Sequence, residues 1–352
     1  MSWPCRFNGQ RQTTRILSNV SRDLHCQFLQ LLGPRSVHTL LKMRCLAAAL
    51  WAIVLLFVGC LVASTCHAQD LAPRAYIITP LHSNALNLTY SYLDGSLIFD
   101  GTVPITDAKA RVNLSAITLS HSLNFFGRTA MLNATLPYGV GNFRGTVADA
   151  EAYAYRSGLL SSSFRFSVNL KGGPAMNVQQ YAKWRQKTII GVSIKLVPPT
   201  GQYNPTKLIN YGSNRWAFKP ELGYSRRMGR WMLDAYGGVW FFTMNHEFFP
   251  GTNTQSQSPT GSFEGHLSYD FKPRWWVSLD GNYWFGGTTS INDVQNEATV
   301  QKNSRIGVTA SIPLSKHQSI KVSYNNGAYI RYGGNYQNIS VSWQYSWLGR
   351  PN

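Results

Sequence analysis

Cysteine is missing from most of this chain. All five cysteines of the 352 residues lie at Cys66 or before it, so a body that begins after them has no disulfides and no thiolate metal ligands. Acidic residues are also scarce, with 15 Asp and Glu against 33 Lys and Arg. After Ala63 the chain has no long hydrophobic run, which excludes a body built of membrane-spanning helices.

One uncharged hydrophobic run does occur, at residues 46–63. It begins just after Met43 and the basic residue Arg44, and it ends in the segment Thr65-Cys66-His67-Ala68, which is rich in small residues. This is the order of the basic region, hydrophobic core and cleavage site of a secretory signal peptide. We therefore predict that residues 43–68 are a signal peptide and that residues 69–352 form the mature body.

Two other interpretations of this run stay open. Its length of about 18 residues approaches the roughly 20 that a membrane-spanning helix needs. Cys60 or Cys66 would carry the lipid if the chain were a lipoprotein. Residues 1–42 form a basic, polar N-terminal extension that sets the run unusually far from the start, so Met43 is an alternative initiation site.

The body stays basic after the leader is removed. The leader holds seven basic residues and one acidic residue of the +18 total, which leaves about +12 on residues 69–352. Such a balance suits nucleic acid, anionic lipid headgroups or an anionic solute. Nucleic acid is the poor match, because the Lys and Arg residues are spread singly and form no basic run.

The body shows a period of two. Between residues 83 and 347, apolar residues recur at every second position over stretches of about nine to twelve residues, as in Ile306, Val308, Ala310 and Ile312. We predict an all-β fold, an antiparallel transmembrane β-barrel of about twelve strands. The predicted strands are 84–93, 112–124, 128–137, 159–170, 186–197, 214–225, 231–242, 260–271, 274–286, 302–313, 318–328 and 335–347.

The predicted connections alternate in length. Short turns are predicted at 126–128, 228–230, 272–274 and 314–317, and long polar loops at 94–111, 138–158, 198–213, 243–259 and 287–301. This asymmetry is typical of outer-membrane barrels and places both termini in the periplasm. The connection 171–185 is the exception, because it is long enough for one short amphipathic helix, either on the rim or reaching into the pore.

A soluble β-sandwich also has alternating strands. The predicted strands exceed the five or six residues common in soluble sheets. Aromatic residues also cluster near strand ends, as the two interfacial girdles of a membrane barrel require. The last predicted strand resembles the aromatic-ended strand by which outer-membrane barrels are recognised for assembly. These features favour the membrane barrel.

Four segments carry a more specific resemblance, with the stretch PPTGQY (198–203) followed by NRW (214–216) as the most distinctive part. The segments are 159–173, 191–227, 233–243 and 304–315. They resemble the bacterial family named for the MetA pathway of phenol degradation, whose members are often described as transporters. The resemblance implies an outer-membrane barrel linked to the catabolism of aromatic compounds, and it implies no catalytic residues.

The alternation along each predicted strand separates side chains that point into the barrel from those that point outward. Taking the apolar positions as outward, the charged candidates for the pore lining are Arg165, Lys187, Lys195, Arg215, Lys219, Glu221, Asp234, Glu264, His266, Asp270, Asp280, Arg305 and Lys321. Such a lining would favour small anions. The alternative is that these charges pair across the lumen and fill it. The inward aromatics Trp240, Phe242, Trp276 and Trp284 suit an interfacial girdle better than a ring within the pore.

An enzyme is a competing class, because Ser and His on adjoining strands can hydrolyse lipid. His82-Ser83, His121-Ser122 and His266 with Ser268 supply the residue types. Neighbours along a strand point to opposite faces, so His121 and Ser122 cannot act as one pair. The chain also has no Gly-x-Ser-x-Gly or His-Glu-x-x-His motif. We therefore do not expect an enzyme.

The sequence thus predicts a monomeric barrel in the outer membrane of a Gram-negative-type bacterium, with passive diffusion of small solutes, including anionic or aromatic ones. No cofactor or metal is implied. The expected partners are outer-membrane lipid, periplasmic chaperones, the barrel-assembly machinery and the solute, and no nucleic acid is expected. A structural or adhesive barrel without transport is the alternative.

Overall fold

The chain folds into a closed barrel of twelve antiparallel strands. The computed structural model describes residues 71–98, 105–147 and 149–349, and the predicted segments 1–42 and 43–68 lie outside these residues. The barrel strands are β1 (Ser83–Ile98), β2 (Ile105–Phe125), β3 (Arg128–Val147), β5 (Ser163–Lys171), β6 (Thr188–Val197), β7 (Ala217–Met228), β8 (Trp231–Phe242), β11 (Thr260–Lys272), β12 (Trp275–Gly286), β15 (Gln301–Pro313), β16 (Gln318–Tyr329) and β17 (Gly333–Leu348).

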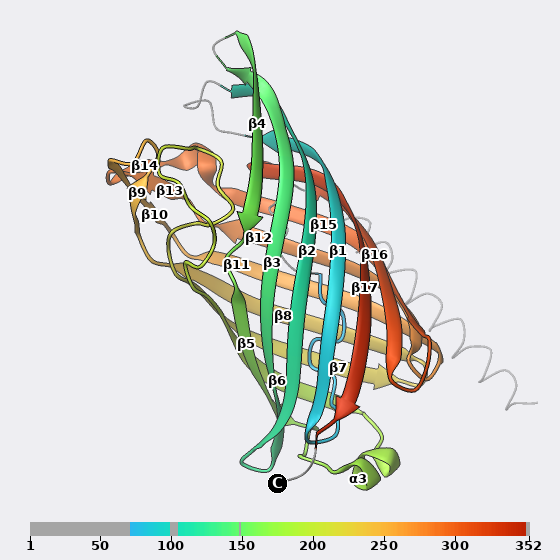
Figure 1. The fold of residues 1–352 in the computed structure, drawn as a ribbon. Helices are drawn as coiled ribbons and strands as arrows, with labels where there is room; N and C mark the ends of the chain where they lie inside the picture. The colour runs from blue at the N-terminus through green and yellow to red at the C-terminus, as the bar shows by residue number, and fades with distance from the viewer. Residues whose placement is uncertain (1–70, 99–104, 148, 350–352) are drawn as a thin grey trace, which may run out of the picture. The chain divides into compact units, whose positions relative to one another are not determined.

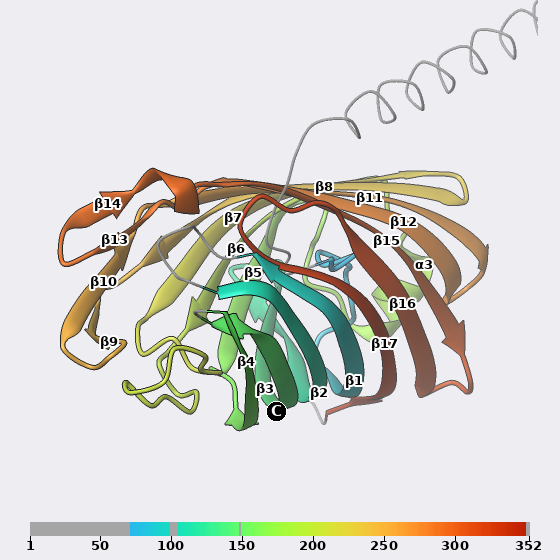
Figure 2. The same cartoon turned by 90° about the horizontal axis from the view of Figure 1, so that it is seen from above.

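Pairing of the first and last strands closes the ring (Figures 1 and 2). β1 bonds to β17 along sixteen register pairs, from Ser83 opposite Leu348 to Ile98 opposite Gly333. Every one of the twelve predicted strands overlaps one of these barrel strands, so the predicted fold class is confirmed. The period of two decides the assignment, because each strand buries one face in the barrel and turns the other outward.

The predicted loops 94–111 and 138–158 are wrong in extent. β1, β2 and β3 continue through most of both stretches, and β4 (Ala150–Leu159) pairs with the second half of β3. β3 therefore changes partner, bonding to β5 through 130–135 and to β4 through 138–147. These extensions lack the apolar alternation of a lipid-facing strand, since they rise beyond the barrel wall, as the upper part of Figure 1 shows.

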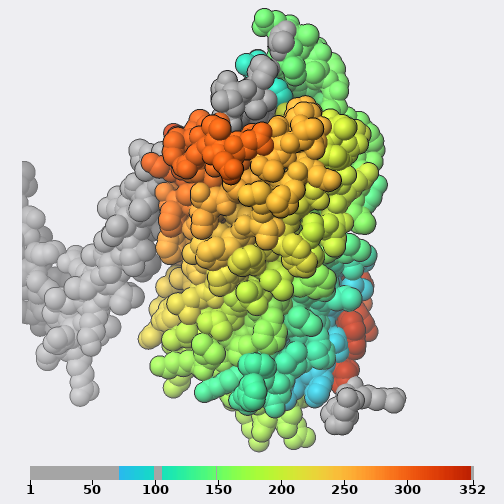
Figure 3. All heavy atoms as spheres, turned by 90° about the vertical axis from the view of Figure 1, so that its left-hand side faces the viewer, coloured from blue at the N-terminus to red at the C-terminus, as the bar shows by residue number. Residues whose placement is uncertain are grey.

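The predicted loops 243–259 and 287–301 form a second, smaller sheet. It contains β9 (Asn245–Phe248), β10 (Asn253–Gln257), β13 (Thr289–Ile291) and β14 (Val294–Asn296), in the order β14-β13-β10-β9, followed by a short 3-10 helix η1 (Glu297–Thr299). Figure 3 shows these residues, in yellow-orange and orange, packed over the long-loop end of the barrel. The predicted loop 198–213 is confirmed as an irregular connection between β6 and β7.

The short turns gather at the opposite end of the barrel. β1 starts and β17 ends at this end, together with the helix α3 (Val178–Lys183) between β5 and β6 (Figure 1). Asn177 caps this helix, since its side chain accepts from the backbone N–H of Gln180 at 2.8 Å. The helix predicted within 171–185 is thus confirmed. The asymmetry of turn and loop lengths matches the pattern from which a periplasmic short-turn end is predicted.

The outer face of the barrel is a band of exposed apolar side chains. Leu222, Leu279 and Val308 keep 57%, 50% and 52% of their surface exposed, although they lie in the middle of their strands. Aromatic residues flank this band, including Trp231 and Trp275 toward the short turns. A soluble sheet would bury such a band, so this face is the one that contacts lipid. Among the residues that the structure describes, no helix is long and apolar enough to cross a membrane.

The apolar band makes a prediction for Leu279. The substitution Leu279→Arg should destabilise the barrel by about 2–4 kcal/mol, the cost of a cation near the bilayer midplane. Urea unfolding in lipid vesicles, followed by the heat-modifiable mobility of the folded barrel on a denaturing gel, measures this cost. The matched control is Val294→Arg on β14, where Val294 is 72% exposed outside the barrel wall. Equal costs for both variants would contradict the assignment of Leu279 to the lipid face.

Candidate functional site

The lumen contains an inner segment that the sequence did not reveal. Residues 71–80, which we call the lumen segment, precede β1 and lie inside the ring of strands, where Figure 2 shows them in blue. The segment follows the inner wall. Leu71 lies against β15 beside Gly307, Arg74 binds Asp270 of β11 at 2.6 Å, and Tyr76 contacts β6 and β7.

Tyr76 is the main anchor of the lumen segment. It is 2% exposed, and its hydroxyl donates to Glu221 Oε1 at 3.0 Å and lies 3.0 Å from Ser193 Oγ. The guanidinium of Arg165 lies 4.6 Å from the centre of the Tyr76 ring. Such a cation–π contact adds to the apolar burial of the ring.

A pair of glycines makes room for the Tyr76 ring. Gly191 of β6 and Gly223 of β7 face each other in register. A Cβ atom at either position would lie 2.4 or 2.1 Å from ring atoms of Tyr76, closer than atoms can approach. Glycine inside a strand weakens the strand and commonly marks a close approach of other atoms. The two glycines therefore form a notch that fits this one side chain.

Backbone contacts complete the docking of the segment. The N–H of Ala75 donates to the Tyr236 hydroxyl at 3.0 Å, and Arg165 donates to the Ala75 carbonyl at 3.2 Å. Beyond Tyr76, the side chain of Ile78 joins an apolar cluster. The buried members of this cluster are Tyr76, Ile78, Met176, Ile189 and Tyr236, with Tyr181 and Trp184 of the α3 region packed against it.

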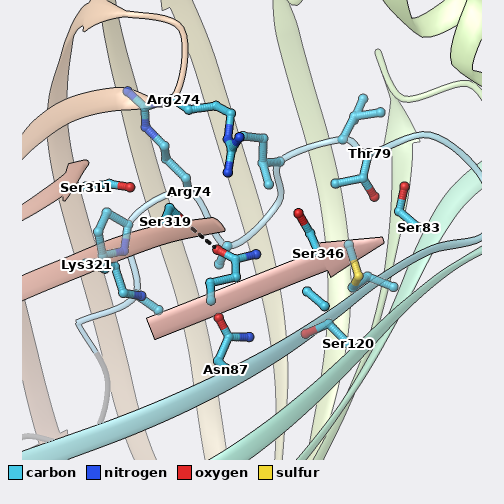
Figure 4. A pocket seen from close by; sticks show the side chains of 18 of the residues that line it. Arg74, Thr79, Ser83, Asn87, Ser120, Arg274, Ser311, Ser319, Lys321 and Ser346 are labelled. Carbon is cyan, nitrogen blue, oxygen red and sulfur yellow. Dashed lines mark hydrogen bonds between the residues drawn. The ribbon is translucent and has the colours of Figure 1, made fainter. Parts of the chain in front are cut away.

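Beside the lumen segment the barrel keeps an open cavity of about 1350 Å³. Much of its wall carries small uncharged polar side chains from β1, β2, β16 and β17, including Asn87, Ser120, Ser319 and Ser346. Figure 4 shows Arg74 and Thr79 of the lumen segment on one side and Asn87 and Ser120 on the other. The cavity extends to the short-turn end, because Gly229, Pro273 and Lys316 of the turns also line it.

The opposite wall of the lumen carries paired charges. Arg165, Lys195 and Lys219 occupy neighbouring register positions on β5, β6 and β7. Lys219 Nζ lies 2.7 Å from Glu221 and 3.0 Å from Glu264, and Arg165 lies 3.2 Å from Glu221. These groups are nearly buried, and buried charges persist only when they are paired in this way.

A second row of polar groups crosses β7, β8, β11 and β12 at one level. Ser225, Asp234, His266 and Asp280 follow one another in register. His266 Nδ1 lies 2.8 Å from Asp280, Asp280 accepts from Ser278 and Thr309, and Asp234 accepts from Ser225. These hydrogen bonds tie β7 to β8, and β11 to β12 and β15, from inside the barrel.

The structure places twelve of the thirteen predicted lining residues inside the barrel or at its mouth. Those that line the large cavity are Arg165, Lys195, Lys219, Glu221, Glu264, Asp270 and Lys321, and those buried outside its lining are Asp234, His266, Asp280 and Arg305. Arg305 donates to Asn325 at 2.7 Å and its guanidinium lies 3.9 Å from the Tyr336 ring centre. Arg215 lies at the long-loop end. Lys187 is the exception, because it is exposed just before β6 and outside the lining of the large cavity.

The inward aromatics are not girdle residues. Trp240 and Trp284 are only 5% and 4% exposed, and both line a smaller cavity of about 280 Å³ near the long-loop end. Phe242 lines the same cavity, whereas Trp276 lies under the guanidinium of Arg74 at 4.4 Å. The girdle prediction for these four residues is therefore wrong. Their positions in the strand alternation point their side chains into the barrel and away from the lipid that girdle residues contact.

Trp240 marks the boundary between the two cavities. The Nζ atoms of Lys195 and Lys219, which line the large cavity, lie 5.7 and 5.8 Å from its ring centre. Its other side faces the smaller cavity, where Arg215 stacks on Phe242 with its guanidinium 4.6 Å from the ring centre. Burial lowers the pKa of Arg215 to about 10, so the group stays charged at neutral pH.

The Ser and His candidates do not assemble into a nucleophile. His121 bonds to Asn84 at 2.8 Å, and His266 bonds to Asp280. In the described residues, no serine Oγ hydrogen-bonds to a histidine ring, and no group of three or more His, Cys, Asp or Glu is placed to hold a metal ion.

Comparison with known proteins places the chain in a family. The family model described as "Putative MetA-pathway of phenol degradation" matches residues 96–336, more than half of the chain. The chain belongs to this family. The match confirms the resemblance carried by the four segments between residues 159 and 315, and it spans ten of the twelve barrel strands in full. No match was found among curated proteins.

One solved structure shows the same fold. The COG4313 outer membrane channel from Pseudomonas putida F1 is similar with a TM-score of 0.65 and 16% identity, covering 79% of this chain and all of that one. The transport unit of the autotransporter AIDA-I from Escherichia coli has a TM-score of 0.47 and 11% identity, covering 83% and 97% of the two chains. The KdgM porin in complex with oligogalacturonate has a TM-score of 0.42 and 11% identity, covering 75% and 99%.

The glycine notch makes a prediction for the lumen segment. Because the predicted mature body has no cysteine, Ile78→Cys is a unique reporter, and in the native barrel this position is buried and should react slowly with a thiol reagent. Adding Gly223→Ala should expel Tyr76, since overpacking costs about 1–3 kcal/mol, and should raise the labelling rate about tenfold.

The matched control is Gly265→Ala, at a strand position where an added Cβ meets no atom within 4 Å. That variant should label as slowly as the parent. Equal labelling of the Gly223 and Gly265 variants would contradict the docking of Tyr76 in the notch.

Proposed function

We propose that this chain is a monomeric outer-membrane channel through which small solutes, including anionic and aromatic ones, diffuse passively. The observation that carries the proposal is the polar cavity of about 1350 Å³ that remains beside the lumen segment. Strand side chains alone can fill a narrow barrel, so a cavity of this size within the wall supports a route for solute. The family and the fold of the COG4313 channel agree with it.

The charge of this cavity favours anions. Its lining holds eleven Arg and Lys residues and three Asp and Glu residues. Four of these cations, Arg230, Lys272, Arg274 and Lys316, lie at the turns of the short-turn end and are exposed. A ring of cations at a mouth raises the local concentration of anions and slows cations.

The inner charges contribute less to selectivity than their number suggests. Arg165 and Lys219 are paired with Glu221 and Glu264, and Arg74 is paired with Asp270. Reversing such a buried charge removes its partner's compensation and destabilises the fold by about 3–5 kcal/mol. The residues that set selectivity are therefore those of the short-turn mouth.

A closed structural barrel is the second candidate. The observation that favours it is the lumen segment itself, which, together with the inner polar rows, occupies part of the cross-section. Transport then requires passage between the segment and the Ser-rich wall of β1, β16 and β17, or displacement of the segment.

The charged mouth makes a prediction for ion selectivity. Reversing Arg230, Lys272 and Lys316 together to Glu should lower the anion-to-cation permeability ratio about tenfold at low ionic strength, because the mouth would then repel anions. Reversal potentials of single channels under a salt gradient measure this ratio. Arg274 is left intact because it donates to the carbonyls of Ser315 and Lys316.

The control replaces three exposed cations that do not line the cavity: Arg144, Lys207 and Lys302. The charge change is the same, and the permeability ratio should stay within about twofold of the parent value, since these side chains lie outside the lining of the cavity. An unchanged ratio in the mouth variant, with conductance intact, would contradict the selectivity assignment.

We also propose that residues 43–68 act as a signal peptide and are removed on export. The basic Arg44, the uncharged apolar run 46–63 and the small residues before Ala68 support removal, because they follow the order of a cleaved signal peptide. After export, periplasmic chaperones and the barrel-assembly machinery would receive the chain, with the aromatic end of β17 as the recognition element.

The proposed cleavage makes a prediction for the mature terminus. Mass spectrometry of the protein extracted from outer membranes should show Gln69 as the first residue. Ala68→Lys should block cleavage, because the cleavage site requires small residues, whereas Gln69→Ala should be processed normally. Outer-membrane protein that still carries residues 43–68 would contradict the proposal.

A further inference from the structure

The smaller cavity, at the long-loop end, has the composition of a binding site. It lies between the ends of β8, β11, β12 and β15 and the small sheet, since Gln255 and Gln257 of β10 and Thr289 of β13 form part of its lining. Of its ten lining residues none is acidic, one is a cation, and four are aromatic. The only formal charge in the lining is therefore the positive charge of Arg215.

Arg215 is held rigidly and has unused hydrogen-bonding capacity. Its guanidinium stacks on Phe242 at 4.6 Å, and its Nη2 donates to Gln257 Oε1. Gln257 is itself oriented, because its Nε2 donates to the Gly287 carbonyl at 3.1 Å. The other terminal nitrogen, Nη1, is buried without a hydrogen-bond partner, and the described residues include no carboxylate in ion-pair contact with Arg215.

A second buried polar group in this cavity also lacks a partner. Thr260 is 3% exposed, and its Oγ1 has no hydrogen bond. A buried donor without a partner costs about 1–3 kcal/mol, and more when the group is charged. Two such groups in the lining of one cavity provide hydrogen-bonding capacity that a ligand can satisfy.

The apolar walls define the rest of the ligand. Trp240 and Phe242 are nearly parallel, with an interplanar angle of 12° and ring centres 6.4 Å apart, and Trp284 is buried in the same lining. Flat aromatic walls favour a flat ligand. The volume of about 280 Å³ is at the lower limit of the roughly 300–1000 Å³ typical of small-molecule sites, so it suits a single ring.

We propose that this cavity is a recognition site for a monocyclic aromatic carboxylate, with its carboxylate on Arg215 and its ring among Trp240, Phe242 and Trp284. The proposal rests on the channel function and names its substrate class. A guanidinium presents parallel N–H groups to a carboxylate, and stacking on Phe242 fixes the plane of that fork. Lys195 and Lys219, on the far side of Trp240, continue the positive path into the large cavity.

The test is calorimetric titration of the folded barrel in detergent with three probes. Benzoate carries both features, benzyl alcohol lacks the charge, and cyclohexanecarboxylate lacks the aromatic ring. Benzoate should bind at least about tenfold more tightly than either, because each of the other two probes lacks one of the two contacts that the site offers. Benzyl alcohol binding as tightly as benzoate would overturn the role of Arg215, and cyclohexanecarboxylate doing so would overturn the aromatic subsite.

The variant Arg215→Met should weaken benzoate at least about tenfold and leave benzyl alcohol within about twofold. The matched control is Arg331→Met, which changes an exposed arginine at the same end that does not line the cavity. Heat-modifiable mobility establishes that both variants are folded. Arg215→Lys should recover only part of the affinity, since an ammonium cannot form two parallel bonds or stack. Unchanged benzoate affinity in Arg215→Met would overturn the proposal.

Conductance of the same proteins separates this site from the channel function. A conducting barrel that does not bind benzoate overturns the recognition site and leaves the channel intact. A folded barrel that binds benzoate through Arg215 but never conducts supports the site and contradicts the channel.

Discussion

The whole structure depends on one constraint, that a backbone surrounded by lipid must satisfy every N–H and C=O within itself. A sheet meets this constraint only by closing, since an open edge would leave a row of unpaired groups in hydrocarbon. Here the closure is the long pairing of β1 with β17. Once the sheet closes, the period of two along each strand divides the side chains into a lipid face and a lumen face. A side chain cannot move from one face to the other, because the backbone of the barrel wall lies between them.

Closure at twelve strands also determines what the interior must contain. The ring is wide enough that strand side chains do not meet at its axis, and polar groups facing the lumen need partners or water. The lumen segment supplies some of these partners, because Arg74 binds Asp270, and the Tyr76 hydroxyl bonds to Ser193 and Glu221. The remaining space is lined by Ser, Thr and Asn, which water can solvate. The closure of twelve strands therefore has two results. Charged side chains pair along one wall of the lumen, and an open polar passage remains along the other.

The strands could be predicted from the sequence, because alternation is a local signal and each strand carries it. Inward positions such as Glu264 and His266 follow from the same parity. The extension of β1 to β4 beyond the barrel wall could not be predicted, since those residues lack the apolar alternation of the lipid-facing stretches. The lumen segment has no period, and its hydrogen-bond partners in the barrel wall lie 90 to 196 residues away. Its one signal was the occurrence of Gly191 and Gly223 within neighbouring strands, which only the register shows to be a notch. The same holds for the pairing of Lys219 with Glu264 and for the lack of a partner at Arg215 Nη1. Both depend on distances between side chains, whereas the strand alternation gives only the face on which each side chain lies.

The central claim is that solute passes through the lumen beside the docked segment. Single-channel recording of refolded residues 69–352 in a planar bilayer, compared with residues 81–352, tests it most directly. The longer chain should give stable conductance with anion preference under a salt gradient, and the shorter chain should give a larger conductance because the lumen segment is gone. Silence from the longer chain, in protein shown to be folded by its heat-modifiable mobility, would contradict the claim.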